Sequence, residues 1–507
     1  MADYIDDLCE KGLVDGCDSA NKLDLYADGL KIYTTLDTRM QKYAEAAVQK
    51  QMAVIQRNFN NHWGKTNPWQ NEKHEEIPNF IEDLAKRTDT YKYYSNKFPN
   101  EPDSVNYYLN LPHKVKLFSY DGPKEEVMST MDSIRYMVKF MHCGFVAIEP
   151  QTGAVKAWVG DVDFDSWKYD KVTAMRQPGS TFKLFVYTEA MNQGLTPCDT
   201  RVDEWKQYPD TINGEPTTWT PTNANGYFTG AAIPLKAAFA QSINSIAVKL
   251  GYEMGIHNVA RTAHEMGIKS PLHETPALSL GASDVNLLEL VNSYGTVIND
   301  GKAHDPLLVQ KIVDRDGNVI YEAEVQDVQA IPYRSAYLMQ QLLRGGMTER
   351  GGTTAALWSY IHPVASMTEF GGKTGTSNNH SDAWFVGVTP NLVVGAWVGG
   401  EYRSIHFRTG ALGQGSRTAL PICGYFLNDV LLDDRFAQYR VKFAPPKEDL
   451  DPSSWNCSGY YYAPADTDSV AVNDSVSMTI DRVESDSLLN GKASENIDLP
   501  PIEHVMP

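Results

Sequence analysis

A serine and a lysine three residues apart are the first candidates for covalent chemistry. Ser180 follows the turn-forming pair Pro178-Gly179, and Lys183 stands in the helix predicted after it. On one helix face, a neutral lysine can remove the proton that makes a serine hydroxyl a poor nucleophile. Burial and a second nearby cation would both lower the pKa of Lys183. Because S-x-x-K arises by chance about once or twice in a chain this long, a capping serine and a surface lysine are the alternative.

Ser242 and Asn244 lie in the stretch PLKAAFAQSINSIAVKLG. One helix is expected to end at Ala240 and a second to begin near Asn244. Both polar side chains therefore stand at a break, where they can point into a cleft. A hydroxyl there can relay protons, and a carboxamide can hold a substrate amide. The alternative is that Asn244 only caps the second helix.

The third candidate is the hexapeptide GGKTGT, in which Lys373, Thr374 and Thr376 offer a cation and two hydroxyls. Such a set suits a carboxylate, and Gly375 lets the backbone lie close to a ligand. A phosphate-binding P-loop also ends in Gly-Lys-Thr, but it requires a glycine where this chain has Met367. The sequence therefore indicates a carboxylate site here and excludes a P-loop.

Two predicted hairpins flank these candidates. Gly144–Gly160 contains the runs GFVAIE and AVKAWVG, and Asp382–Gly399 contains DAWFVGVT and LVVGAWVG. About 220 residues of mainly helical pattern lie between the hairpins, which predicts an α+β domain whose sheet closes around a helical insertion.

The remaining segments differ in pattern. Leu30–Leu36 alternates like a strand, and an amphipathic helix of about four turns follows, with Thr38 and Gln41 placed as a capping box. Asn58–Met141 has weak periodicity, so we expect short helices and loops whose many aromatic residues pack inside a small subdomain rather than form a binding surface. From Ala465 onward there are nine acids, two bases and no aromatic residue, which predicts a disordered tail.

Composition excludes several classes of protein. The 507 residues include 45 Lys and Arg against 64 Asp and Glu, a net charge of −19, which argues against nucleic-acid binding. No apolar run approaches the roughly 18–20 residues that a bilayer span needs, and the acidic N-terminus does not resemble a signal peptide. As given, the chain is expected to be soluble.

Cysteine and histidine patterns indicate no metal site and no cofactor. None of the six cysteines forms a CxxC pair, so we expect unlinked thiols or one incidental bridge, with Cys9 and Cys17 able to close a small loop. His264-Glu265 and His273-Glu274 lack the second histidine of H-E-x-x-H. The Gly-x-Ser-x-Gly signature is absent too, which disfavours an α/β-hydrolase.

In this order, the three polar elements resemble the S-x-x-K, S-x-N and K-T-G motifs of penicillin-binding proteins and β-lactamases, with Ser-Ile-Asn in place of Ser-Asp-Asn. Longer stretches are similar to the transpeptidase part of class A (bifunctional) penicillin-binding proteins, over roughly residues 30–50 and 144–430. They are LKIYTTLDTRMQKYAEAAV, GFVAIEPQTGAVKAWVG, RQPGSTFK, LSLGASDVNLLELVNSYGTVINDG and GKTGTSNNHSDAWFVGVTPNLVVGAWVG.

The resemblance implies a fold and a domain organisation. The expected fold is an α+β transpeptidase domain, with a five-stranded antiparallel sheet, helices on both sides and a helical subdomain. No stretch resembles the family's glycosyltransferase motifs or its membrane anchor, so we expect part of a longer enzyme. The predicted domains are a connecting segment (1–57), an inserted Tyr/Asn-rich subdomain (58–141), the transpeptidase domain (142–446) and a mostly disordered acidic tail (447–507).

The resemblance also implies a mechanism. Ser180 attacks the carbonyl between the terminal D-alanines of a peptidoglycan stem peptide, Lys183 accepts its proton, and the backbone N–H groups of Ser180 and Thr376 form the oxyanion hole. D-Alanine leaves with a proton passed through Ser242, a relay that Lys373 supports. An amine from a neighbouring stem peptide then resolves the acyl-enzyme. Substrate binding is assigned to Asn244, Thr374, Gly375 and Thr376.

Partners, location and rival functions follow from the same resemblance. The implied ligands are stem peptides, glycan strands and β-lactams, with wall-synthesis proteins as further partners, at the outer face of the cytoplasmic membrane. One rival function is hydrolysis by the same residues, as a D,D-carboxypeptidase or β-lactamase. The other is a non-catalytic β-lactam sensor or scaffold, against which the full set of polar motif residues argues.

Overall fold

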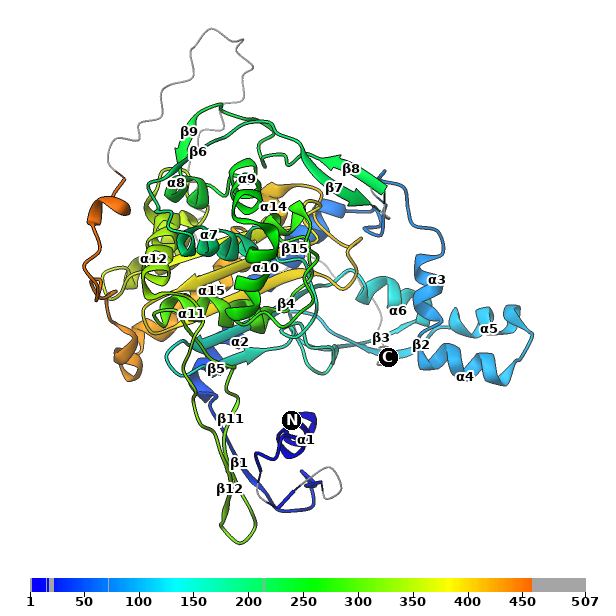
Figure 1. Cartoon of the computed structure of the whole chain (residues 1–507). Coiled ribbons are helices and arrows are strands. Elements are labelled where there is room, and N and C mark those ends of the chain that lie inside the picture. The colour runs from blue at the N-terminus through cyan, green and yellow to red at the C-terminus, as the bar shows by residue number, and fades with distance from the viewer. Residues whose placement is uncertain (1, 15, 18–21, 72, 213–214, 458–507) are drawn as a thin grey trace.

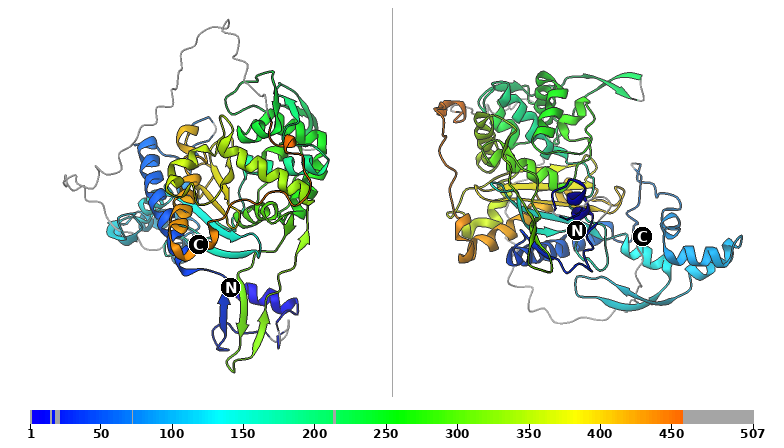
Figure 2. Two further views of the ribbon diagram at one scale, coloured as in Figure 1. Left: turned by 90° about the vertical axis from the view of Figure 1, so that its left-hand side faces the viewer. Right: turned by 60° about the horizontal axis from the view of Figure 1, so that its bottom comes forward.

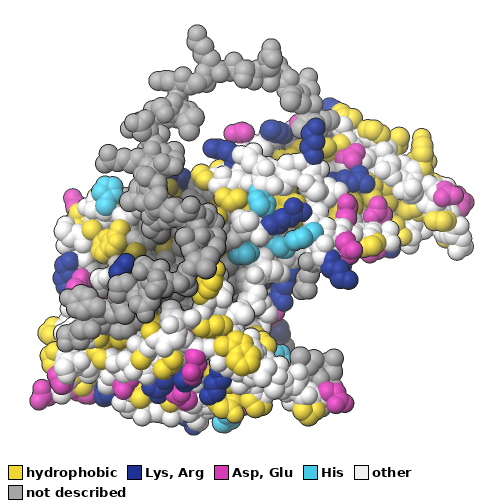
Figure 3. All heavy atoms as spheres, turned by 90° about the horizontal axis from the view of Figure 1, so that it is seen from above, with side chains coloured by type: hydrophobic (Ala, Val, Ile, Leu, Met, Phe, Trp, Pro, Cys, Tyr) yellow, Lys and Arg dark blue, Asp and Glu magenta, His cyan; other side chains and the backbone are white. Residues whose placement is uncertain are grey.

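The computed structural model of the chain describes residues 2–14, 16–17, 22–71, 73–212 and 215–457 (Figure 1). The acidic tail predicted from residue 465 onward lies outside the described residues. In the described part of the chain, no helix is both long and apolar enough to cross a membrane. On the face seen from above, cationic and anionic side chains lie interspersed among hydrophobic ones (Figure 3).

A five-stranded antiparallel sheet forms the centre of the molecule. Across the sheet the strands are β14 (Gly371–Thr376), β15 (Asp382–Val388), β16 (Val393–Gly400), β4 (Met141–Glu149) and β5 (Ala154–Val159). Both predicted hairpins are present, β4 with β5 and β15 with β16. They join into one sheet because β16 pairs with β4, where Trp397 lies opposite Gly144. The predicted α+β fold with a five-stranded sheet is confirmed.

Helices cover both faces of this sheet (Figure 2), and alternate side chains of β4 enter two different cores. Phe145 and Ala147 belong to one core and Val146 and Ile148 to the other, as the alternation of a strand requires. Because both faces are buried, the strands read as continuous apolar runs. One face is covered by α2 (Thr38–Trp63) and α15 (Ala419–Leu432), and the other by α7 (Lys183–Asn192), α11 (Leu287–Ile298) and α12 (Tyr333–Thr348).

Between the hairpins the chain is mainly helical, as predicted, but it also contains short strand pairs. Each of these strands is two to five residues long, which is too short for a period-two pattern to be recognised in the sequence. The helices here are α8 (Leu235–Ala240), α9 (Asn244–Met254), α10 (Ile256–Glu265) and α13 (Trp358–Ile361), and α14 (Gly410–Gly413) follows the second hairpin. The pairs are β6 (Thr200–Val202) with β9 (Ala232–Pro234), β7 (Tyr208–Ile212) with β8 (Glu215–Trp219), and β10 (Lys302–Ala303) with β13 (Val328–Gln329).

The N-terminal segment contains the predicted strand and helix, but the helix is longer than the predicted four turns, at 26 residues, and is capped differently. Strand β1 (Lys31–Thr34) pairs with β11 (Val309–Val313), which pairs with β12 (Val319–Glu322), and this small sheet projects from the body (Figure 1). Helix α2 is capped by Asp37, whose carboxylate accepts from two backbone N–H groups, so the predicted Thr38–Gln41 capping box is wrong. Thr38 cannot be the cap, because it is already the first helical residue. Helix α1 (Ala2–Glu10) precedes this segment.

The segment predicted as an insertion consists of short elements, as expected. Helix α2 continues to Trp63, so the expected boundary at residue 58 falls inside a helix. Several aromatic rings stack within the segment, with Tyr108 lying 4.6 Å from Tyr94 and 5.2 Å from Phe98 between ring centroids. The elements are α3 (Phe80–Ala85), α4 (Asp89–Lys97), α5 (Pro102–Leu109), β2 (His113–Leu117), β3 (Lys124–Met128) and α6 (Thr130–Met137).

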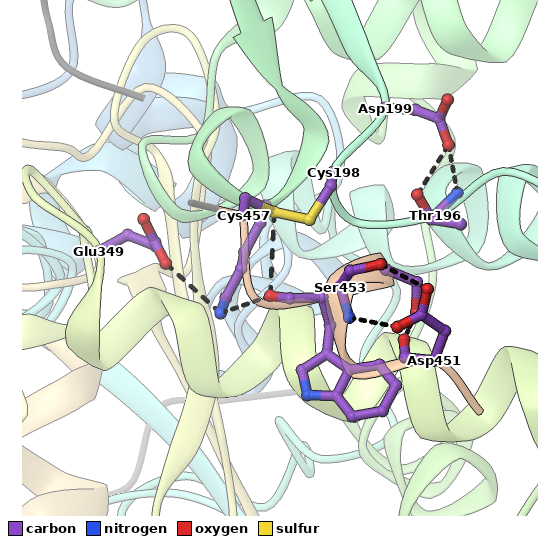
Figure 4. Close-up of a disulfide and its surroundings, with 10 residues drawn as sticks. Thr196, Cys198, Asp199, Glu349, Asp451, Ser453 and Cys457 are labelled. Carbon is purple, nitrogen blue, oxygen red and sulfur yellow. Dashed lines mark hydrogen bonds and ion pairs between the residues drawn. A yellow bond between two sulfur atoms is a disulfide. The ribbon is translucent and has the colours of Figure 1, made fainter. Parts of the chain in front are cut away.

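Two disulfides are present, so the expectation of at most one incidental bridge is wrong. Cys9 bonds to Cys17, and Cys198 bonds to Cys457 across 259 residues, a separation that no local pattern could reveal (Figure 4). Next to the second bridge, Trp455 is buried and the Lys236 amine donates to its carbonyl oxygen. The sequence assigns residues 447–457 to the tail, but the disulfide at Cys457 joins this stretch to the helical subdomain.

Candidate active site

Ser180 lies in a tight turn beside the end of an edge strand. The turn is the 3₁₀ helix η1 (Gly179–Phe182), directly before α7. Ser180 thus lies at the start of a buried helix, as predicted. Gly179 has φ of 53°, and a Cβ there would lie 2.7 Å from the backbone oxygen of Thr376, so only glycine suits this approach. Within the described ranges the half-buried Ser180 hydroxyl has no hydrogen-bond partner, which leaves it available to a substrate.

Lys183 is the first residue of α7, and its amine is fully buried. The Nζ donates to the carbonyl oxygen of Ser242 at 2.7 Å and to Oδ1 of Asn244 at 2.7 Å, and it lies 3.2 Å from the Ser242 hydroxyl. Burial, and next the charge of Lys373, lower the pKa of Lys183 well below its ordinary value. A lysine whose pKa is lowered gives up its proton more easily than an exposed lysine does, which suits it to act as a base.

Ser242 and Asn244 stand at the break between α8 and α9, as predicted. Ser242 has φ of 61°, in the left-handed region that a residue with a Cβ rarely adopts. Strain of this kind is kept where the surrounding structure requires it, often at functional sites. Here it directs both the carbonyl oxygen and the hydroxyl of Ser242 towards Lys183.

Lys373 lies on β14 and approaches the same hydroxyl from the sheet. Its Nζ donates to Ser242 Oγ at 2.8 Å and to the carbonyl oxygen of Thr374 at 3.0 Å. Burial lowers the pKa of Lys373 to about 7. In the described part of the chain, neither Lys373 nor Lys183 has a carboxylate within ion-pairing distance. The Ser242 hydroxyl therefore joins two buried amines whose pKa values both lie below the ordinary lysine value.

The rest of the GGKTGT strand forms the wall next to Ser180. A Cβ on Gly375 would lie 2.4 Å from the oxygen of Pro178, so this glycine permits the close contact between β14 and η1. Thr374 Oγ1 lies 2.8 Å from Thr353 Oγ1, and Thr376 Oγ1 accepts from the backbone N–H of Gly415 at 3.1 Å. Because β14 is an edge strand, its outer backbone groups are open to pair with an extended ligand.

Sequence reasoning missed several residues that shape the site. Gly281 has φ of 75°, and a Cβ there would lie 2.3 Å from the oxygen of Gly179. The Tyr294 hydroxyl donates to the carbonyl oxygen of Thr181 at 2.8 Å, which fixes the turn from behind. Thr353 has no sequence signal, whereas Gly281 lies in the stretch LSLGASD, whose glycine after an apolar run indicates a turn.

A cluster of charged side chains contacts the segment before Ser180. Lys171 is fully buried, and its Nζ lies 2.6 Å from Glu401 and 3.7 Å from Asp161. His142 Nδ1 lies 2.8 Å from Asp161. The guanidinium of Arg176 donates to the carbonyl oxygen of Glu401 at 2.9 Å, which ties the segment before Ser180 to the end of β16.

Comparison with known proteins identifies the family. The model of the penicillin-binding protein transpeptidase domain matches residues 143–396, half of the chain. The chain belongs to the penicillin-binding protein family. The model of the penicillin-binding protein middle domain matches residues 64–141. The predicted resemblance is therefore confirmed, and the chain carries a transpeptidase, that is, acyltransferase, domain.

Individual relatives agree with this assignment. Penicillin-binding protein 2D of Bacillus subtilis is 31% identical over 60% of this chain and 42% of its own length. Penicillin-binding protein 1A of Rickettsia felis is 28% identical over 83% of this chain and 56% of its own length. The chain thus spans about half the length of the curated relatives that it matches.

Solved structures show the same fold. Penicillin-binding protein 1A from Haemophilus influenzae has a TM-score of 0.59 at 21% identity, covering 85% of this chain and 70% of that one. PonA1 from Mycobacterium tuberculosis, solved in complex with penicillin V, has a TM-score of 0.52 at 22% identity, covering 81% of this chain and 88% of that one.

Proposed function

We propose that this chain is a serine-type peptidoglycan D,D-transpeptidase that crosslinks stem peptides and is inhibited by β-lactams. The observation that carries the proposal is the Ser242 hydroxyl, which two buried amines contact from α7 and β14. This arrangement lies beside the turn that holds Ser180. Family membership supplies the reaction class, and the geometry supports these residues as its machinery.

Acylation begins when Ser180 attacks the carbonyl between the two terminal D-alanines. Lys183 accepts the serine proton, since burial lowers its pKa. The backbone N–H groups of Ser180 and Thr376 stabilise the negative oxygen, and loss of one such donor costs about 3–4 kcal/mol in other acyl-transfer enzymes. The bond to the terminal D-alanine breaks, and its nitrogen takes a proton through the Ser242 hydroxyl, which Lys373 contacts.

Substrate recognition uses Asn244 and the GGKTGT strand. Asn244 donates one amide hydrogen to the carbonyl oxygen of Thr222, which leaves its second N–H for a carbonyl of the donor peptide. Thr374 and Thr376 bind the terminal carboxylate, and Gly375 lets the peptide lie against β14. The amine of a neighbouring stem peptide then attacks the ester, forms the crosslink and releases Ser180 with its proton.

We further propose that the protein acts at the outer face of the cytoplasmic membrane, within a longer, anchored chain that also contains a peptidoglycan glycosyltransferase. Relatives of which this chain matches only 42% and 56% of the length support this. The two disulfides support an oxidising compartment outside the cytoplasm, because disulfides rarely persist in the cytosol.

Wall-synthesis proteins are proposed as partners of the segment predicted as an insertion. Helices α4 and α5 extend away from the sheet, and Tyr93 and Tyr107 on them are 59% and 62% exposed (Figure 2). Deleting these helices should abolish complex formation with the wall-synthesis machinery while leaving acylation of Ser180 intact. Unchanged complex formation would reject this part of the proposal.

Intact mass after incubation with a penicillin tests the central assignment. We expect one added penicillin that maps to Ser180 and is absent in Ser180→Ala. Ser166→Ala is a matched control, because Ser166 is also half-buried but lies outside the three motifs. An adduct elsewhere, or none, would reject Ser180 as the nucleophile.

Transfer and hydrolysis are separated with a stem-peptide donor and a D-amino acid. A transpeptidase exchanges the terminal D-alanine for the added amine, whereas a carboxypeptidase releases only the shortened peptide. Fast hydrolysis without exchange would replace the proposed transpeptidase with a hydrolase built on the same residues.

A further inference from the structure

The loop of residues 220–229, which follows β8, holds the start of the helix that carries Asn244. Asn223 Oδ1 accepts from the backbone N–H of Asn244 at 3.0 Å and from that of Ser245 at 3.1 Å. The first N–H groups of a helix need such acceptors, and the N-cap residue of α9, Ile243, has no side chain that could serve. Asn223 therefore caps α9 from a distant part of the sequence.

Asp203 fixes this remote cap in place. Its Oδ1 accepts from Asn223 Nδ2 at 2.8 Å and from the Ser245 hydroxyl at 2.6 Å. Its Oδ2 accepts from the backbone N–H of Thr229 at 2.8 Å and from the hydroxyl of Thr229 at 2.9 Å. Burial alone would raise the pKa of Asp203, but these hydrogen bonds outweigh it and lower the pKa. The carboxylate is thus a charged acceptor that joins the loop to α9.

The same loop sets the orientation of the Asn244 carboxamide. Asn244 Nδ2 donates to the carbonyl oxygen of Thr222 at 2.8 Å, which turns Oδ1 towards Lys183. A carboxamide turned by half a rotation would present N–H groups to the amine, and the acceptor would be lost. The backbone position and the rotamer of Asn244 therefore both depend on residues 222 and 223.

We propose that Asn223 and Asp203 are positioning residues for acyl transfer, which act by holding Asn244 against Lys183. Nothing in the three motifs assigns either residue. The inference rests on the proposed function, because it needs Lys183 to act as the base for Ser180. Neither Asn223 nor Asp203 contacts Lys183, so both act through Asn244.

The proposal predicts a change in pH dependence. Oδ1 of Asn244 accepts from the amine of Lys183, and such a bond favours the protonated lysine. The charged side chain that acts on Lys183 is that of Lys373 on β14, and the neutral groups that face it are Ser242, in the break before α9, and Asn244, the first residue of α9. Releasing Asn244 removes the acceptor, so the pKa of Lys183 falls further. The acid limb of the acylation rate should then move to lower pH.

The test compares penicillin acylation rates across pH for the wild-type chain, Asn223→Ala and Asn225→Ala. Asn225 is the control, because it lies two residues away in the same loop and its side chain accepts from the backbone N–H of Tyr227 rather than from α9. Asn223→Ala should acylate about 10–100-fold more slowly, the loss typical of a displacement near 1 Å, with its acid limb at lower pH. Asn225→Ala should keep the wild-type rate and profile.

Each possible result either supports or overturns the positioning role. A wild-type rate and profile in Asn223→Ala, or a lower rate with an unmoved limb, would overturn the positioning role. If Asn223→Ala does not fold by circular dichroism, Asn223→Gln is judged by the same criteria, since it keeps the amide but displaces its oxygen from the N–H groups of Asn244 and Ser245. Absence of acylation in the wild-type chain would instead reject the proposed function.

Discussion

Buried lysines occur in two settings in this molecule, which differ in whether a carboxylate lies next to the amine. Lys171 is fully buried between Glu401, at 2.6 Å, and Asp161, at 3.7 Å. Lys183 and Lys373 are buried just as deeply, but their partners are a hydroxyl, carbonyl oxygens and an amide. A carboxylate compensates a buried ammonium, whereas a lysine without one loses its proton more easily. The setting proposed for a catalytic base is therefore burial without a carboxylate partner, and not burial alone.

The largest effect is expected from Lys183→Met. Acylation of Ser180 by a fluorescent penicillin should slow by about 10²–10⁴-fold, the usual contribution of a general base. The melting temperature should stay the same or rise, because the variant no longer buries an uncompensated amine. A variant that acylates at the wild-type rate would remove Lys183 from the mechanism.

Lys171→Met should have the opposite pattern. Removing this amine leaves the buried Asp161 and the half-buried Glu401 without this cation, and breaking a buried pair in this way typically costs about 3–5 kcal/mol of folding free energy. Urea denaturation measures that loss, and the acylation rate per folded molecule should stay within about tenfold of wild type. Unchanged stability, or a stable variant that no longer acylates, would erase the distinction between the two settings.

The pH dependence of stability sharpens the comparison. Burial lowers the pKa of Lys373 to about 7, so above pH 7 the folded chain has released a proton that the unfolded chain still holds. Stability then rises with pH, by up to about 1.4 kcal/mol per unit, until the unfolded lysine also titrates near pH 10.5. Below pH 7 both states hold the proton, and the contribution no longer changes.

Urea denaturation of the wild-type chain and of Lys373→Met across this range measures that slope. The unfolding free energy of the wild-type chain should rise relative to that of the variant between pH 7 and about pH 10. Parallel curves for the two proteins would mean that Lys373 keeps its proton when buried.

The smallest effect concerns the strained backbone at Ser242. With φ of 61°, this position favours glycine, so Ser242→Gly should be more stable than Ser242→Ala by about 1 kcal/mol. Both variants lack the hydroxyl between the amines and should acylate equally slowly. Equal stability of the two variants in thermal melts would show that the strain is absent.

Local patterns predicted much of the fold and the candidate residues. The hairpins at 144–160 and 382–399 have β-rich runs joined by short turns, and the structure contains both. The break around Ser242 is equally local, since one apolar stretch ends before it and another begins after it. The structure then brings Lys183, Ser242 and Lys373 together. The sequence predicts this contact only through the family resemblance, because the three residues are far apart along the chain.

What the sequence could not supply depends on partners that are distant along the chain. Asn223 caps a helix that begins 21 residues later, and no capping pattern spans such a gap. Cys198 and Cys457 are 259 residues apart, and β1 pairs with β11 across most of the chain. Among the residues that the structure describes, no acid lies next to Lys183, which separates it from Lys171. This too is a property of packing, because no local motif records which side chains lie nearby.

The most direct test of the central claim is an NMR titration of the chain labelled with ¹³C at lysine Cε, with the Lys183 signal assigned by its loss in Lys183→Arg. The account predicts that this signal titrates well below the ordinary lysine value of 10.5. A Lys183 signal that titrates at or above 10.5 would show a protonated amine at neutral pH and would contradict its role as the base.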